Sequence, residues 1–221
     1  MTLEARRTGK PRLAGTTPFP VLIMILLVAV PLAACSSAAH SPAALTATKQ
    51  VHVSPVGPDG SPARGFRTTM TIADANCEAG SEVIGQAYRC FAGNFVYDPC
   101  WAERASGPTV LCVPFPWSAT DIRLQVNAPL SAIPAEPGTS EPWGVELADG
   151  QRCVLFQGAH SLFAGRVIDY YCTSRLSLLR GLTQTSAVWR AASVTDVGGK
   201  QAAGPSEQIK IAWFGRPDSY R

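Results

Sequence analysis

WGVELADGQRCVLFQ, residues 143–157, is the stretch that best predicts the fold of this chain. Trp143 to Leu147 and Arg152 to Gln157 are short segments rich in apolar residues, and the tripeptide 148–150 (Ala-Asp-Gly) separates them. Asp-Gly is a favoured dipeptide in tight hairpin turns, because both central residues of such a turn need a positive φ. The stretch therefore predicts a β-hairpin.

Further strand-like segments lie on both sides of this hairpin. The earlier ones are Arg67 to Ala73, Asn94 to Tyr97, Thr109 to Val113 and Ile122 to Val126. The later ones are Gly165 to Cys172, Leu176 to Leu179, Ala187 to Val194 and Ile209 to Phe214. No segment shows a long helical period. The pattern predicts a mainly β fold, a single disulfide-stapled sandwich or small barrel.

Seven cysteines are present, and one of them, Cys35, stands apart near the N-terminus. The other six lie among the predicted strands: Cys77, Cys90, Cys100, Cys112, Cys153 and Cys172. An even number of cysteines in an exported chain is typical of a disulfide framework, although spacing alone leaves several connectivities open. Pairing cysteines that flank a common turn favours 77–90, 100–112 and 153–172. Each bond would stabilise the fold by about 3 kcal/mol.

The N-terminal region has the features of a secretory signal peptide. Val21 to Val30 is an apolar run preceded by several basic residues, and it is shorter than the roughly 20 residues that span a bilayer. Leu32-Ala33-Ala34-Cys35 follows this run and resembles a bacterial lipobox. The resemblance implies cleavage before Cys35 and attachment of diacylglycerol to its sulfur, and two acyl chains make a stable anchor. We expect a lipoprotein on the outer face of the cell membrane; an ordinary signal peptide or an uncleaved anchor are the alternatives.

Composition divides the chain into four parts. Residues 1–34 are the expected signal peptide, 35–64 the lipidated cysteine and an Ala/Ser/Pro-rich tether, 65–216 the β domain, and 217–221 a tail. The tether has too few large apolar residues to fold alone. The alternative for its last part is that Gln50 to Val56 adds an edge strand to the domain.

The charge distribution argues against a nucleic-acid partner. The whole chain has a formal net charge of +3, and the basic residues before the cleavage point account for that excess. The mature part is near neutral and has no run of lysine or arginine. Binding to nucleic acid or to anionic lipid requires clustered basic residues. The expected membrane contact is therefore the lipid on Cys35.

The surroundings of several cysteines resemble a known group of proteins. AYRCFAGNFVYDPCW (87–101), LCVPFPW (111–117) and WGVELADGQRCVLFQGA (143–159) are similar to segments of uncharacterised secreted or lipid-anchored proteins of actinobacteria. The resemblance implies a location in the cell envelope. It carries over no catalytic residue.

Catalytic motifs are scarce in the sequence. His160 is the one histidine in the predicted domain, and a hydrolase would need it beside a carboxylate or would use a carboxylate pair. The carboxylates available are Glu103, Asp121, Glu146, Asp149 and Asp169. Neither G-x-S-x-G nor H-E-x-x-H occurs, and the cysteines lack the close pairs typical of zinc sites. We expect no metal and no cofactor.

Two tryptophans are candidates for a binding surface. Trp117 and Trp143 each follow a proline, so they could lie at loop edges and form an aromatic patch; packing in the core is the alternative. The sequence favours a non-catalytic domain that binds an envelope protein or a glycan. The alternative is an envelope hydrolase that uses His160 or a carboxylate pair.

Overall fold

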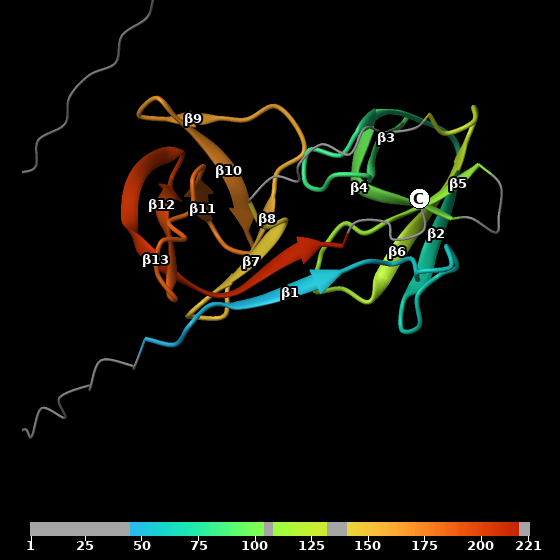
Figure 1. The fold of residues 1–221 in the computed structure, drawn as a ribbon. Coiled ribbons are helices and arrows are strands. Elements are labelled where there is room, and N and C mark those ends of the chain that lie inside the picture. Colours follow the sequence, from blue (N-terminus) through green and yellow to red (C-terminus); the bar gives the residue numbers. More distant parts are fainter. Residues whose placement is uncertain (1–44, 104–107, 132–140, 217–221) are drawn as a thin grey trace, which may run out of the picture. The chain divides into compact units, whose positions relative to one another are not determined.

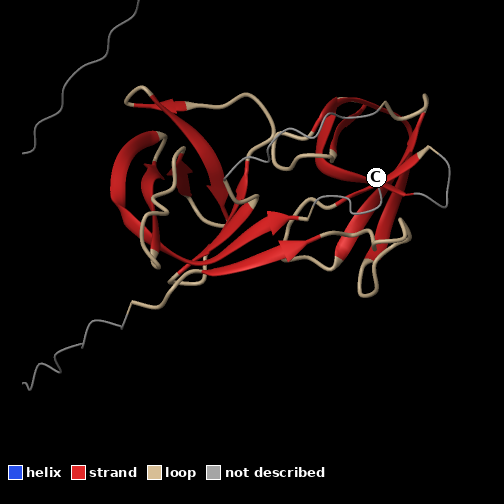
Figure 2. Ribbon diagram, viewed as in Figure 1, coloured by secondary structure: helices blue, strands red, loops and turns tan. Residues whose placement is uncertain are grey.

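A computed structural model describes residues 45–103, 108–131 and 141–216, and all its regular elements are strands (Figures 1 and 2). The predicted signal peptide, Cys35 and the tail at 217–221 lie outside the described residues. Within the described residues, no helix is long and apolar enough to cross a membrane. The mainly β class is confirmed.

Five strands form a closed barrel in the first part of the chain (Figure 1). They are β2 (Arg67–Gly80), β3 (Tyr88–Ala92), β4 (Phe95–Glu103), β5 (Thr109–Cys112) and β6 (Thr120–Val126). Neighbours along the chain pair antiparallel, and β6 returns to pair parallel with β2. Two disulfides, 77–90 and 100–112, lie in the core of this barrel among buried aliphatic residues.

Six further strands form a second barrel. They are β7 (Gly144–Leu147), β8 (Arg152–Leu155), β10 (Arg166–Cys172), β11 (Leu176–Leu179), β12 (Trp189–Val197) and β13 (Lys200–Gly215), and a short β9 (Leu162–Phe163) pairs with β10. The long β13 closes this barrel, because its first part pairs with β12 and its last part pairs with β7. The sequence predicted one sandwich or barrel, and that prediction is wrong. The domain contains two barrels.

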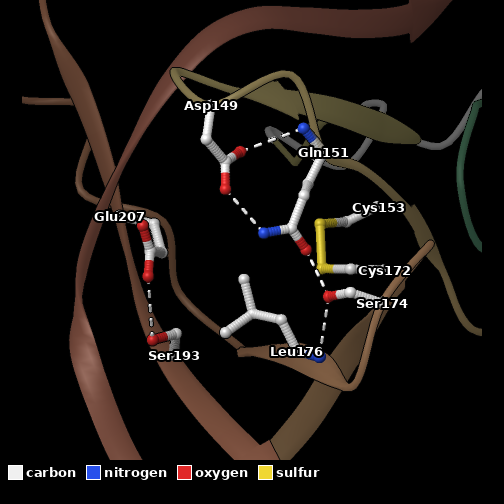
Figure 3. The surroundings of a disulfide bond; sticks show 8 residues. All are labelled: Asp149, Gln151, Cys153, Cys172, Ser174, Leu176, Ser193 and Glu207. Carbon is white, nitrogen blue, oxygen red and sulfur yellow. Dashed lines mark hydrogen bonds between the residues drawn. A yellow bond between two sulfur atoms is a disulfide. The ribbon is translucent and has the colours of Figure 1, made fainter.

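The hairpin predicted from residues 143–157 is confirmed as β7 and β8. Gly150 has φ of +88°, which glycine adopts readily, but Asp149 is not among the residues with positive φ, so the turn differs from the type in which both central residues have one. The amide of Leu147 donates to the carbonyl of Gln151 at 2.8 Å. Figure 3 shows how this turn contacts Ser174, which follows β10. Asp149 accepts hydrogen bonds from Gln151, whose side-chain carbonyl accepts one from the Ser174 hydroxyl. The turn between β7 and β8 is thereby tied to the turn that follows β10.

All three predicted disulfides are present. They join Cys77 to Cys90, Cys100 to Cys112 and Cys153 to Cys172. The 153–172 bond links facing positions of β8 and β10 and is drawn in Figure 3.

Part of the predicted tether belongs to the fold. β1 (Lys49–Val53) pairs parallel with β13 from Ile211 to Gly215, and Val56 is buried in a core cluster. The prediction that the tether extends to residue 64 is thus too long, and the edge-strand alternative describes this segment better. This segment contains few large apolar residues. It can still join the sheet, because an edge strand pairs largely through its backbone groups.

A shared core joins the two barrels. Trp101 of the first barrel packs against Trp143 of the second, with ring centroids 5.8 Å apart, and both side chains are fully buried. The Trp101 indole also donates to the backbone carbonyl of Arg216 at 2.9 Å. Trp101 on β4 therefore contacts the residue before β7 and the residue after β13.

Candidate functional site

An apolar cavity of about 340 Å³ lies where segments of both barrels meet. Its walls come from residues 94–98, 112–114 and 154–158. Phe95 and Phe156, which line it, are 70% and 37% exposed, so large apolar surface faces solvent here. Ligand sites are usually concave, mainly apolar and about 300–1,000 Å³ in volume. This cavity has the size and lining of such a site.

Asp98 lines the same cavity and is a buried carboxyl group. It accepts hydrogen bonds from the Ser81 hydroxyl and from the amide of Glu82, the latter at 2.9 Å. Burial raises its pKa to about 7, although the Ser81 hydrogen bond and the nearby Arg89 act in the opposite direction. Asp98 lies within β4, directly before Pro99. The apolar cavity therefore has a titratable group in its wall.

A second cavity of about 330 Å³ adjoins the first, because Leu155 and Phe156 line both. Its remaining lining is polar: Glu82, Glu141, His160, Asp169 and Arg180. One cavity is apolar and the other is lined by charged groups, and they share Leu155 and Phe156. We call the pair the cleft, and its two cavities the apolar end and the charged end.

His160 and Asp169 meet in the charged end of the cleft. The Nδ1 atom of His160 lies 3.2 Å from Oδ1 of Asp169 and 3.1 Å from the carbonyl oxygen of Ile168. Asp169 is almost fully buried on β10, and Arg180 donates to both of its oxygens at 2.8 and 2.9 Å. This ion pair raises the pKa of the Arg180 guanidinium. The carboxylate is therefore held firmly beneath the imidazole.

Glu141 completes the charged end. Burial and the negative charge of Asp169 raise the pKa of its carboxyl group, while a hydrogen bond from Tyr170 partly offsets them. The Tyr170 hydroxyl lies 3.3 Å from Glu141 and 2.6 Å from the carbonyl of Pro142. Burial also raises the pKa of Tyr170, so this phenol stays protonated and acts as a donor.

Arg89 connects the two barrels behind the cleft. It pairs with Glu82, and its Nη2 donates to the carbonyl of Gln157 at 2.8 Å. In the described part of the chain, Arg89 Nε and Gln157 Oε1 are buried atoms without a hydrogen-bond partner. Buried polar groups are nearly always satisfied, so a water or ligand atom bound at these two atoms would complete their hydrogen bonding.

The predicted aromatic patch does not form around Trp143. That side chain is fully buried against Trp101, so it offers no surface to a ligand. Trp117 is only partly buried, stacks on Phe115 and contacts Trp213. The two tryptophans thus differ in exposure, because Pro116 and Trp117 close over the backbone of Gly144 beside Trp143.

Of the five candidate carboxylates, only Asp169 lies with His160. Glu103 pairs with Arg123, Glu146 pairs with Arg152 and Lys210, and Asp149 forms the hairpin turn. Asp121 accepts a hydrogen bond from Thr68 at 2.7 Å. These four therefore act within the fold. No sequence motif indicates that Glu141 and Arg180 join the site.

Three cysteine sulfurs lie close together in the first barrel. Those of Cys90, Cys100 and Cys112 are within 4.8 Å of one another. All three take part in disulfides, so they are not the thiolates that bind metal ions. The cluster is part of the hydrophobic core.

Comparison with known proteins found no matching family model, curated protein or solved structure.

Proposed function

We propose that this chain is a lipid-anchored envelope protein whose two-barrel domain binds an amphipathic molecule in the cleft. The observation that carries the proposal is the wall shared by an apolar cavity and a charged one. A ligand with an apolar body and a polar head matches that division. The lipobox-like segment at Leu32 to Cys35 and the three disulfides support a location outside the cytoplasm.

Exposed aromatic side chains at the apolar end support binding in that place. Phe156 contacts Tyr171 with ring centroids 4.8 Å apart, and its ring lies against Gly158, where a β-carbon would clash with it. The ring is thus held in position before any ligand arrives, which lowers the entropy cost of binding.

The test is a fluorescence titration of the full chain with N-phenyl-1-naphthylamine, a neutral apolar dye. We expect saturable binding that Phe95→Ser weakens at least about tenfold, since a buried aromatic contact contributes on the order of 1.5–3 kcal/mol. Leu162→Ser is the matched control, because Leu162 is 62% exposed but lines neither cavity. Equal loss in both variants, or no saturable binding, would overturn the proposal.

A further inference from the structure

The hydrogen bonds of His160 define which of its nitrogens carries the proton. Its Nδ1 faces the Ile168 carbonyl at 3.1 Å and the Asp169 carboxylate at 3.2 Å. Both partners are acceptors, so the proton of the neutral imidazole resides on Nδ1. The other nitrogen, Nε2, is then an unprotonated acceptor. That arrangement makes His160 a base.

Neighbouring groups hold the imidazole in place. Arg180 fixes Asp169 with two hydrogen bonds, and the Phe156 ring meets the imidazole edge-on with centroids 5.9 Å apart. Phe156 also lines the apolar end of the cleft. A base that is oriented beside an apolar binding site can act on the polar end of an amphipathic ligand.

The same cavity contains a second carboxyl group and a guanidinium cation. Glu141, whose carboxyl pKa is raised, lines this cavity together with His160. Arg180 uses Nε and Nη2 on Asp169, and its side chain is 58% exposed. Its remaining N–H groups are able to stabilise a developing negative charge. Among the described residues that line the cavity there is no serine, threonine, cysteine or lysine, so the nucleophile is water.

We propose that His160 is the general base of a hydrolase that cleaves a carboxylic ester, with the acyl chain of the substrate in the apolar end of the cleft. This inference rests on the proposed binding function. Asp169 is a positioning residue. It orients the imidazole, and both of its oxygens already have partners in Arg180 and His160.

The reaction needs only water as a second substrate. His160 Nε2 removes a proton from water while the water oxygen bonds to the ester carbon, and the carbonyl electrons move to the oxygen near Arg180. The C=O bond then re-forms, the bond to the alcohol oxygen breaks, and the Glu141 carboxyl donates its proton to that oxygen. The imidazolium proton returns to Glu141 through solvent. The products are a carboxylic acid and an alcohol.

The experiment follows hydrolysis of p-nitrophenyl octanoate and p-nitrophenyl acetate by the purified full chain. We expect catalytic turnover with a higher kcat/KM for the octanoate, and a loss of at least about 100-fold in His160→Gln. His52→Gln is the matched control and should keep full activity, because His52 stacks on Phe214 and lines neither part of the cleft. Asp169→Asn should lower kcat and change its pH profile, which a purely structural role would not do.

Comparing two substrates with different leaving groups distinguishes the role of Glu141 from that of His160. p-Nitrophenolate leaves without a proton, so Glu141→Gln should change its release only a few-fold. The same variant should slow release of octanoic acid from 1-octanoylglycerol at least about tenfold, since an alkoxide needs the proton.

Dye binding distinguishes failure of the chemistry from failure of the cleft. If His160→Gln binds N-phenyl-1-naphthylamine like the unmodified chain but hydrolyses esters equally fast, the base assignment is overturned while binding stands. If the unmodified chain binds the dye but hydrolyses no ester, the base assignment is likewise overturned and binding stands. Hydrolysis that depends on His160 but not on acyl length or Phe95 would overturn the placement of the acyl chain.

Discussion

Replacing Asp98 with asparagine should change how stability depends on pH. Asp98 is 6% exposed, and its carboxyl accepts from the Ser81 hydroxyl and the Glu82 amide. Asparagine keeps the hydrogen bond from the Glu82 amide, which its carbonyl can accept, and reverses the one with Ser81, because its NH₂ donates to the hydroxyl oxygen. The substitution therefore removes the titration while retaining the shape of the site.

The magnitude follows from the difference between the folded and unfolded pKa. The folded value is about 7 against a reference of 3.8, and each unit corresponds to about 1.4 kcal/mol, so the effect is roughly 4 kcal/mol. Below pH 3.8 both states hold the proton and the contribution is fully present. Between 3.8 and 7 the folded state binds more protons than the unfolded state, so stability falls as pH rises. Above pH 7 the loss is complete.

Urea unfolding at several pH values between 4 and 8.5, followed by tryptophan fluorescence with the disulfides intact, measures the effect. The unfolding free energy of Asp98→Asn relative to the unmodified chain should rise by roughly 4 kcal/mol across this range. Asp149→Asn removes the same charge from an exposed turn and serves as the control. The assignment of a buried, protonated Asp98 would be refuted if the difference in unfolding free energy between Asp98→Asn and the unmodified chain stayed constant with pH. It would also be refuted if Asp149→Asn gave the same pH dependence.

Three further predictions concern the disulfides, the ion pair and the anchor. Replacing Cys153 and Cys172 together by alanine should lower the unfolding free energy by about 3 kcal/mol, because the bond closes a loop with a sequence separation of 19. Urea unfolding measures this change. An unchanged unfolding midpoint would contradict the prediction. Arg180→Leu should cost about 1–3 kcal/mol, since it leaves the buried Asp169 carboxylate without its cation, and Asp169→Asn in the same background should recover part of the loss. The intact mass of the native protein should match a chain that begins at a diacylglycerol-modified Cys35 and lacks six hydrogens for its three disulfides; retention of residues 1–34 would contradict the lipobox interpretation.

Local features of the fold could be predicted from the sequence because their signals are local. The hairpin depends on Asp149-Gly150, and the disulfides join cysteines that flank single turns. The number of barrels depends instead on pairings between distant strands, β2 with β6 and β7 with β13. No residue pattern within either strand specifies its distant partner, so the two-barrel arrangement was not predictable in this way.

The strand β13 shows how local signals can mislead. Gly204-Pro205 resembles a turn, yet both residues lie inside this strand. Ala192 pairs with Ser206 and Val194 with Ala203, so Ser193 alone faces the two residues in a β-bulge. Proline, which lacks an amide hydrogen, is tolerated at a bulge, and Ser193 donates to its carbonyl at 2.7 Å. The dipeptide therefore marks an irregularity in pairing inside a continuous strand.

The candidate site depends on which acids the fold leaves beside a cavity. Glu103 and Glu146 each receive an arginine, and those pairings explain their burial. Asp98 and Glu141 are different, because burial raises the pKa of each carboxyl and each lines one of the two adjoining cavities. Burying a carboxyl group is costly to the fold, and carboxyl groups with a raised pKa gather at sites of binding and catalysis. Their position around Phe156, with His160 oriented by Asp169, is the reason that the cleft is the place where ligand binding and acid–base chemistry should be sought.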